Sequence, residues 1–248
     1  MKKNNDYNAS HEAQREIRKL ILNYEYKPGM RLYEPAIAEK LGMSRTPVRE
    51  AMTRLVSCGF LERSEGRRGY FVPNLTPEDM RHVFHLRMVL ERYAAELVDG
   101  QVDGKAIDRM YALNDLETHA FFKSDRECYS ELNEEFHTAF AQLTKNPYLI
   151  RCLGEVTARC TLYSYFFASF YTAATKGVFS PSRKVAAHIE HRALIDALAH
   201  NAFDSARSIL REHTLTAYLH CCGPNSFQEI SGDGMHSYTF QEIIRPQT

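Results

Sequence analysis

The chain has 248 residues, equal numbers of basic and acidic side chains (31 each) and 44% hydrophobic residues. These values are typical of a globular protein with one large or two ordinary domains, and they exclude a polycation that binds through net charge alone. No apolar run is long enough to span a membrane, and the N-terminus lacks the apolar core of a signal peptide. Six cysteines without a framework spacing predict free thiols and a cytoplasmic protein.

The first part of the chain is predicted to be helical after a short disordered start. Residues 1–9 are expected to be disordered. Apolar side chains recur at helical spacing from about His11 to Tyr24, which predicts a first helix. The turn Lys27-Pro28-Gly29 ends it, and a second short helix is predicted from Pro35 to Lys40.

The next segment, Ser44 to Ser57, carries the strongest functional pattern. Ser44 stands at an N-cap position, and the apolar residues behind it form one helical face. Arg45, Thr46 and Arg49 lie at the N-terminal end, off that face. A helix-turn-helix protein inserts such a helix into the major groove, where arginine pairs with guanine or contacts phosphates. The alternative is a surface helix with two solvated arginines.

A β-hairpin is predicted immediately after this helix. Two short apolar runs, Phe60-Leu61 and Tyr70-Phe71-Val72, flank a basic turn bounded by glycines. After a helix-turn-helix, such a hairpin forms a wing whose tip can reach the DNA backbone or the minor groove. The alternative is an ordinary charged hairpin tip. Positive charge is concentrated over this region, which contains Arg45, Arg49, Arg54, Arg63, Arg67 and Arg68.

The second part of the chain shows only helical periodicity. Thr76 and Pro77 are predicted to start its first helix as the N-cap and the first helical position. Breaks are expected near residues 100–104, 123–126, 145–147, 176–182 and 200–203. The fold class is therefore mostly α: an N-terminal winged helix-turn-helix with a small hairpin, and a C-terminal all-α antiparallel bundle. The expected domains are a disordered N-terminus (1–9), a DNA-binding domain (10–73), a linker (74–78), an effector-binding and dimerisation domain (79–221) and a tail (222–248).

Three histidines, His137, His191 and His213, fall on inward apolar stripes of three different helices. A single histidine on such a stripe is usually a hydrogen-bonded core residue. Three that converge in one bundle indicate a site for zinc, nickel or a similar divalent ion, with open positions for water or a ligand. A hydrolytic enzyme is the rival hypothesis, but no general base is placed for it, because Glu134 and Glu190 adjoin candidate ligands and are expected to point elsewhere.

The N-terminal motifs resemble a known family. They are Pro28 to Leu32, Ile37 to Ala51, Gly59, and Gly69 to Val72. Over about residues 12–73 the chain resembles the winged-helix head of GntR-type bacterial transcription regulators. The resemblance implies DNA contacts by Arg45, Thr46 and Arg49 and by the wing around Gly66 and Arg67. Ser44, at the start of the recognition helix, is a further candidate.

The C-terminal motifs resemble the ligand-sensing domain of the FadR-like branch of this family, over about residues 76–218. They are Asn133-x-x-Phe136-His137, Glu190-His191-Arg192-Ala193-Leu194, and Ala206 through His213. The resemblance implies a metal held by Asn133, His137, His191 and His213. Many members have Asp where this chain has Asn133, whose amide oxygen is a neutral and weaker ligand.

Other residues are candidates for binding an effector. Arg87 and Glu91 match the family, in which a basic residue near the metal meets a carboxylate; the alternative is an i,i+4 ion pair on a helix surface. Arg159 and Tyr163 belong to an aromatic segment that could line a pocket, although such stripes are more often core.

Together these features predict an effector-responsive regulator rather than an enzyme. A homodimer is expected to bind a pseudo-palindromic operator and to act as a repressor. A small carboxylate bound at the metal is expected to change its DNA affinity. The alternatives are a regulator whose helical domain only dimerises, and a metal-dependent hydrolase fused to a DNA-binding head.

Overall fold

The computed structural model describes residues 2–63, 68–98, 100, 102–167 and 187–221, with side chains from residue 8 onward. It divides the chain into two compact units, Met1–Thr76 and Pro77–Thr248. This boundary falls inside the predicted linker. The predicted wing-tip residues Gly66 and Arg67, the break at 176–182 and the tail 222–248 lie outside the described residues.

The N-terminal unit contains three helices, α1 (Lys2–Leu22), α2 (Glu34–Leu41) and α3 (Arg45–Ser57). Both α1 and α2 pack against α3, as expected for a helix-turn-helix core. The prediction of a disordered start is not met, because α1 begins at Lys2. No glycine or proline interrupts residues 2–22, so a helix nucleated in the apolar part can propagate towards the N-terminus.

The turn between α2 and α3 follows the sequence prediction. Gly42 adopts the left-handed conformation (φ 63°), and its N–H contacts the carbonyls at the end of α2. Ser44 occupies the N-cap position with extended backbone, but its side chain makes no capping hydrogen bond. The predicted apolar face of α3 is buried, and it comprises Val48, Ala51, Met52 and Leu55.

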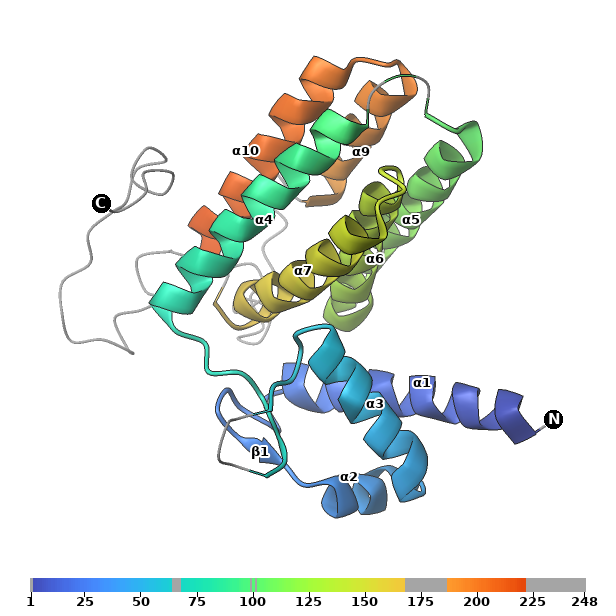
Figure 1. The fold of residues 1–248 in the computed structure, drawn as a ribbon, viewed down its shortest axis with the longest axis vertical. Helices are drawn as coiled ribbons and strands as arrows, with labels where there is room; N and C mark the ends of the chain where they lie inside the picture. Colours follow the sequence, from blue (N-terminus) through green and yellow to red (C-terminus); the bar gives the residue numbers. More distant parts are fainter. Residues whose placement is uncertain (1, 64–67, 99, 101, 168–186, 222–248) are drawn as a thin grey trace. The chain divides into compact units, whose positions relative to one another are not determined.

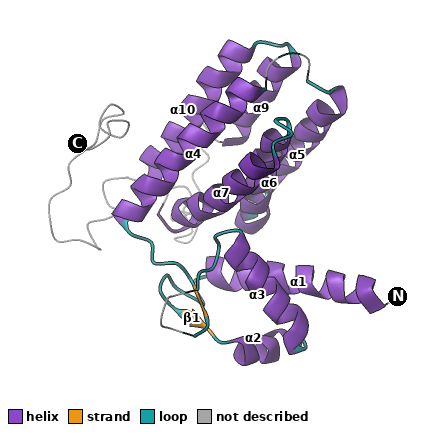
Figure 2. Ribbon diagram, viewed as in Figure 1, coloured by secondary structure: helices purple, strands orange, loops and turns teal. Residues whose placement is uncertain are grey.

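A small antiparallel sheet completes this unit (Figure 2). Strand β1 (Arg31–Leu32) pairs with β2 (Tyr70–Phe71). Glu62 also forms a bridge with Phe71, which closes the base of the predicted hairpin. The sequence prediction missed β1, because two residues are too few to show strand alternation.

The C-terminal unit is all α-helical in its described part, which confirms the predicted class. Its helices are α4 (Pro77–Leu97), α5 (Gly104–Phe122), α6 (Arg126–Gln142), α7 (Pro147–Phe167), α9 (Ala187–Ala199) and α10 (Phe203–Cys221). Each packs against its neighbours in the closed order α4, α7, α6, α5, α9, α10 (Figure 1), and α7 and α10 also contact each other. Among the described helices, none combines the length and the apolar character needed to cross a membrane.

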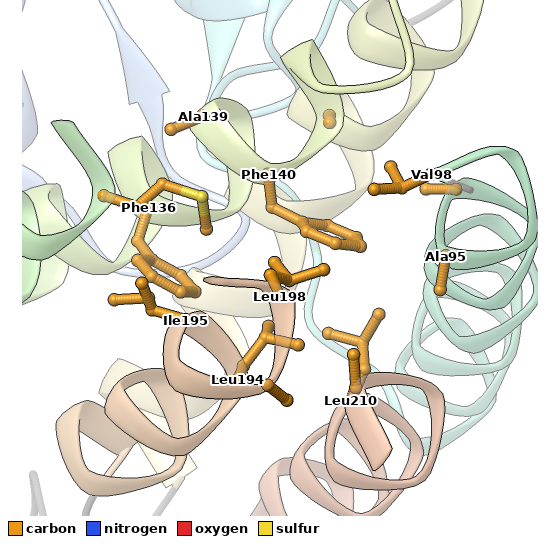
Figure 3. Packing of buried hydrophobic residues seen from close by; sticks show 14 of the residues in the cluster. Ala95, Val98, Phe136, Ala139, Phe140, Leu194, Ile195, Leu198 and Leu210 are labelled. Carbon is orange, nitrogen blue, oxygen red and sulfur yellow. The ribbon is translucent and has the colours of Figure 1, made fainter. Parts of the chain in front are cut away.

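The core of this unit fills the space that the ring of helices encloses (Figure 3). Phe136 and Phe140 of α6 face Leu194 and Leu198 of α9, and Leu210 of α10 lies in the same cluster. Every one of these side chains is at most 2% exposed. Because this apolar layer fixes α6, α9 and α10 against one another, the polar side chains that these helices point into the ring are held at defined separations.

Candidate metal centre and DNA-binding surface

The three histidines of the apolar stripes meet inside the C-terminal unit, as the sequence predicted. His137 comes from α6, His191 from α9 and His213 from α10, and their ligand atoms all lie within 4.8 Å of one another. All three side chains are buried. The Nε2 atoms of His137 and His213 are 3.2 Å apart, and the ring of Phe136 stacks on His191. The histidines therefore form one compact cluster.

The Nδ1 atom of each imidazole contacts a carboxylate. The three pairs, measured from Nδ1 to the carboxylate oxygen, are His137 with Glu91 (2.9 Å), His191 with Glu117 (2.8 Å) and His213 with Glu190 (2.7 Å). A carboxylate accepts the Nδ1–H, so this hydrogen bond selects the tautomer whose Nε2 carries a free lone pair. The same arrangement orients histidines that bind metals.

The carboxylate partners were largely missed from the sequence. Glu190 was expected to point elsewhere, but this is wrong: it adjoins His191 in the chain and reaches His213 on α10. Glu117 lies on α5, 74 residues from its partner, and no local pattern links the two. One signal was available, because Glu117 occupies an inward position among the buried residues Leu113, Ala120 and Phe121.

Asn133 is joined to this cluster through Glu117. Its Nδ2 donates to Glu117 Oε1 (3.2 Å), while the other oxygen of Glu117 meets His191. Asn133 also stands one helical turn before His137 on α6. The described contacts therefore place Asn133 beside the carboxylate that orients His191.

Arg87 and Glu91 form a buried pair on α4, so the alternative of a surface ion pair is wrong. Their side chains are 4% and 2% exposed, and Arg87 Nε lies 2.9 Å from Glu91 Oε1. The Arg87 guanidinium also reaches His137 Nε2 (2.7 Å). The second oxygen of Glu91 accepts a hydrogen bond from the hydroxyl of Thr214.

The electrostatics of this cluster favour the neutral form of two of its imidazoles, those of His137 and His213. Burial lowers the pKa of His137 well below its ordinary value, and the nearby charge of Arg87 lowers it further. Burial likewise lowers the pKa of His213. Burial alone would raise the pKa of Glu91, but the charge of Arg87 and the contacts of His137 and His213 together outweigh it and hold that pKa well below the usual range. Neutral imidazoles are the form that binds metal ions.

The residues present fit a divalent ion. His191 Nε2 is buried and has no hydrogen-bond partner among the described residues, although a buried polar atom is normally satisfied. Three imidazole nitrogens match the preference of zinc and nickel for nitrogen ligands and leave coordination positions for other groups. His137, His191 and His213 could therefore hold such an ion.

The other two candidate effector residues are engaged elsewhere. Arg159 Nε and the Tyr163 hydroxyl both contact Asp79 Oδ2, at 3.1 and 2.7 Å. Tyr163 is fully buried, as expected for the core alternative. No described hydrogen bond or ion pair links either side chain to the three histidines.

A groove between α4 and α10 reaches Glu91, the carboxylate that contacts His137. Its volume is about 380 Å³, and its lining includes Glu91 and Thr214 as well as apolar side chains such as Val89. Three arginines also line it, Arg92, Arg207 and Arg211, together with Glu96, which pairs with Arg92. This combination suits a small anion with an apolar body.

In the N-terminal unit, the described candidate DNA-binding residues gather on one surface. Ser44, Arg45, Thr46 and Arg49 are all exposed at the N-terminal end of α3. Glu34, at the start of α2, was not anticipated: its carboxylate accepts two hydrogen bonds from Arg49, at 3.0 and 2.9 Å. These hydrogen bonds lower the pKa of Glu34. Glu34 therefore holds the guanidinium in one orientation on the exposed face.

The base of the wing is tied to the same helix. The Tyr70 hydroxyl lies 3.2 Å from the hydroxyl of Thr53 on α3 and accepts a hydrogen bond from Arg63 Nη2 (3.1 Å). The Arg63 guanidinium also lies 5.1 Å from the centre of the Tyr70 ring, within the range of a cation–π interaction. The wing and α3 thus form one supported surface.

A winged helix-turn-helix joined to an all-α unit defines a class of bacterial transcription regulators. The family model "Bacterial regulatory proteins, gntR family" matches residues 9–72, and that of the FCD domain matches residues 82–216. The chain belongs to the GntR family of transcription regulators and has the FadR-like architecture with an FCD domain. The family and the relatives are regulators of transcription and not enzymes.

Two individual relatives share about 30% sequence identity with the chain. The chain is 30% identical over 142 residues to the uncharacterized HTH-type transcriptional regulator YdhC of Bacillus subtilis, and 29% identical over 142 residues to the Nta operon transcriptional regulator of Aminobacter aminovorans. These matches cover 57% and 56% of this chain and 63% and 66% of the relatives, so the chain spans less than two-thirds of their length. The solved structure of Escherichia coli McbR/YncC superposes with a TM-score of 0.68 over 90% of this chain and 99% of that one, at 22% identity, which shows a shared fold.

Proposed function

We propose that this regulator acts in the cytoplasm as a homodimeric repressor of a pseudo-palindromic operator, and that a small organic acid bound at a divalent metal ion changes its DNA affinity. The observation that carries the proposal is the cluster of three buried imidazoles. Each is oriented by its own carboxylate, and one Nε2 is unpaired among the described residues. Zinc is the first candidate and nickel the second.

The surrounding residues have defined roles in this proposal. His137, His191 and His213 hold the ion, with Asn133 beside them. Glu91, Glu117 and Glu190 orient the imidazoles. The ion, when bound, supplies open coordination positions for an anionic ligand. Because carboxylic acids are anions at neutral pH, the arginines along the groove between α4 and α10 favour their approach.

The effector must distinguish two states of the protein. A ligand changes DNA affinity only if it binds the DNA-competent and incompetent states with different affinities. The groove includes residues of α4, and α4 begins at Pro77, directly after the N-terminal unit. A change in α4 on binding is thus connected through the chain to the DNA-binding unit.

The proposed dimer has a candidate surface on α4. Four exposed apolar side chains recur there at spacings of three and four residues: Leu86, Val89, Tyr93 and Leu97, each between 42% and 48% exposed. Such a stripe on one helix is suited to packing against a second copy. Arg92 and Glu96 on the same helix pair with each other and could exchange partners across a two-fold axis.

Charges placed in this stripe are expected to separate the dimer. Tyr93→Glu combined with Leu86→Glu would put two carboxylates in the apolar contact, so light scattering after size exclusion should show a monomer, and operator affinity should fall by about tenfold or more because two half-sites are no longer bound together. Leu116→Glu on α5, where the leucine is 55% exposed, is the matched control. A dimer retained in the double variant would rule out this surface.

The contact between Glu34 and Arg49 provides a further prediction. Glu34→Gln removes a negative charge near the DNA and releases the Arg49 guanidinium, so affinity for non-specific duplex should rise a few-fold (about threefold). The folding stability should change by less than about 1 kcal/mol, because Arg49 is exposed. Fluorescence anisotropy titrations would measure the DNA effect.

Glu39→Gln is the matched control for this prediction, because it removes the same charge from the same exposed helix. An equal rise in both variants would show a general charge effect. A fall in Glu34→Gln alone would show instead that Glu34 holds Arg49 in the orientation that DNA requires.

The proposed function is tested by the response of DNA binding to carboxylates. An operator is first selected from a random duplex library, and its affinity is measured for zinc-loaded protein with a panel of mono- and dicarboxylates. At least one acid should change the affinity by about 5-fold to 150-fold, and the change should be absent in His213→Ala. No change with any acid, while DNA binding persists, would favour a helical domain that only dimerises.

A further inference from the structure

The Arg87 side chain lies against the imidazole nitrogens that a metal would use. Its Nη2 is 2.7 Å from Nε2 of His137 and 3.4 Å from Nε2 of His213. Its Nε is bonded to Glu91 at the same time. The whole side chain is buried, and a guanidinium is not deprotonated in proteins. Arg87 therefore brings a positive charge into the cluster.

The position of Nη2 makes this contact exclusive. It lies 2.7 Å from Nε2 and 3.3 Å from Nδ1 of the same His137 ring, so it stands over the face of the imidazole beside Nε2. It also lies 3.4 Å from Nε2 of His213. A metal ion held by these two Nε2 atoms would lie about 2 Å from each and would bring a second positive charge against the guanidinium. His137 can therefore serve Arg87 or a metal, but not both at once.

We propose that Arg87 is an internal competitor that sets the metal affinity of this site, a role that rests on the proposed function. Metal binding displaces Nη2 from His137 and His213, while the bond from Nε to Glu91 keeps the guanidinium close by. The affinity of the site for the metal is therefore lower than it would be if the same three imidazoles had no guanidinium beside them. Because Arg87 belongs to α4, each exchange between guanidinium and metal changes the contacts of that helix.

The test separates this competition from simple charge repulsion. Arg87→Lys keeps the positive charge and a partner for Glu91. It removes the planar guanidinium, whose Nε contacts Glu91 while Nη2 contacts His137. The dissociation constant for zinc is measured by competition with a chromophoric chelator. Arg87→Lys should bind zinc about tenfold more tightly than the wild-type protein, because the contact of Nη2 with His137 no longer has to be broken.

Arg81→Lys is the matched control: it makes the same change on the same helix at an arginine that contacts His82, and no described contact links it to the three histidines. Its zinc affinity should equal that of the wild-type protein. Cobalt(II) absorption of each protein should show the same histidine ligation, and thermal melts should show that each is folded.

Unchanged or weaker zinc binding by folded Arg87→Lys would overturn the competition. His191→Ala distinguishes this failure from failure of the metal site. If His191→Ala loses zinc while Arg87→Lys matches the wild-type protein, the site stands and only the role of Arg87 is wrong. If neither the wild-type protein nor Arg87→Lys binds zinc, the metal site and the competition are both wrong.

Discussion

Replacing Glu91 by alanine is expected to lower the free energy of unfolding by about 3–5 kcal/mol, the usual cost of breaking a buried ion pair. The substitution leaves the buried Arg87 guanidinium without its counter-charge. It also removes the acceptor of His137 Nδ1 and of the Thr214 hydroxyl. Urea unfolding followed by circular dichroism would measure the loss.

Two controls define the origin of this loss. Glu96→Ala breaks an exposed pair with Arg92 and should cost less than about 1 kcal/mol. Arg87→Met combined with Glu91→Met removes both buried charges and should recover much of the stability. Equal losses in Glu91→Ala and Glu96→Ala would contradict the buried pair.

The same carboxylate should make stability depend on acid pH. The pKa of Glu91 is depressed in the folded protein, so its contribution is present above the unfolded value of about 4.3 and is lost as the pH falls towards the folded value. The double methionine variant lacks this contribution, and the stability it retains should be less sensitive to pH below about 4.3.

Arg49→Ala is expected to weaken operator binding by about tenfold to a hundredfold, the range for a bidentate contact to a base. The side chain is exposed at the N-terminal end of α3, so its loss should leave folding stability nearly unchanged. Anisotropy titrations of the selected operator and of a scrambled duplex would measure both affinity and discrimination.

Arg49→Lys separates the two ways in which this residue can bind DNA. Lysine keeps the charge for a phosphate but cannot make a bidentate pair with guanine. If Arg49 reads a base, the lysine variant should lose discrimination almost as fully as the alanine variant. If operator affinity is unchanged in Arg49→Ala, this position is not a DNA contact.

The helices of this chain could be predicted because their signals are local. Apolar periodicity, Gly42 and Pro77 marked the boundaries of α2 and α3 and the start of α4 within one or two residues. Strand β1 carries no such signal in two residues. The helical start of α1 was missed for a related reason: residues 2–9 lack an apolar stripe, and the helix begins there without one.

The candidate metal site was predictable only in part. The histidines could be found because each replaces an apolar residue on an inward stripe, and three such stripes face one core. Their carboxylate partners depend on which helices become neighbours in the ring. Glu117 and His191 are far apart in sequence, and the long reach of Glu190 from α9 to α10 depends on a side-chain direction that sequence spacing does not determine.

A metal-dependent sensor is tested most directly by the metal content of protein purified without chelator or affinity tag, beside His191→Ala prepared in the same way. We expect nearly one equivalent of zinc or nickel in the wild-type protein and its loss in the variant. His191 is the informative position, because its Nε2 has no hydrogen-bond partner among the described residues. Absence of metal from both proteins, with the wild-type fold intact, would contradict a metal-dependent sensor and leave the histidines as residues of a polar core.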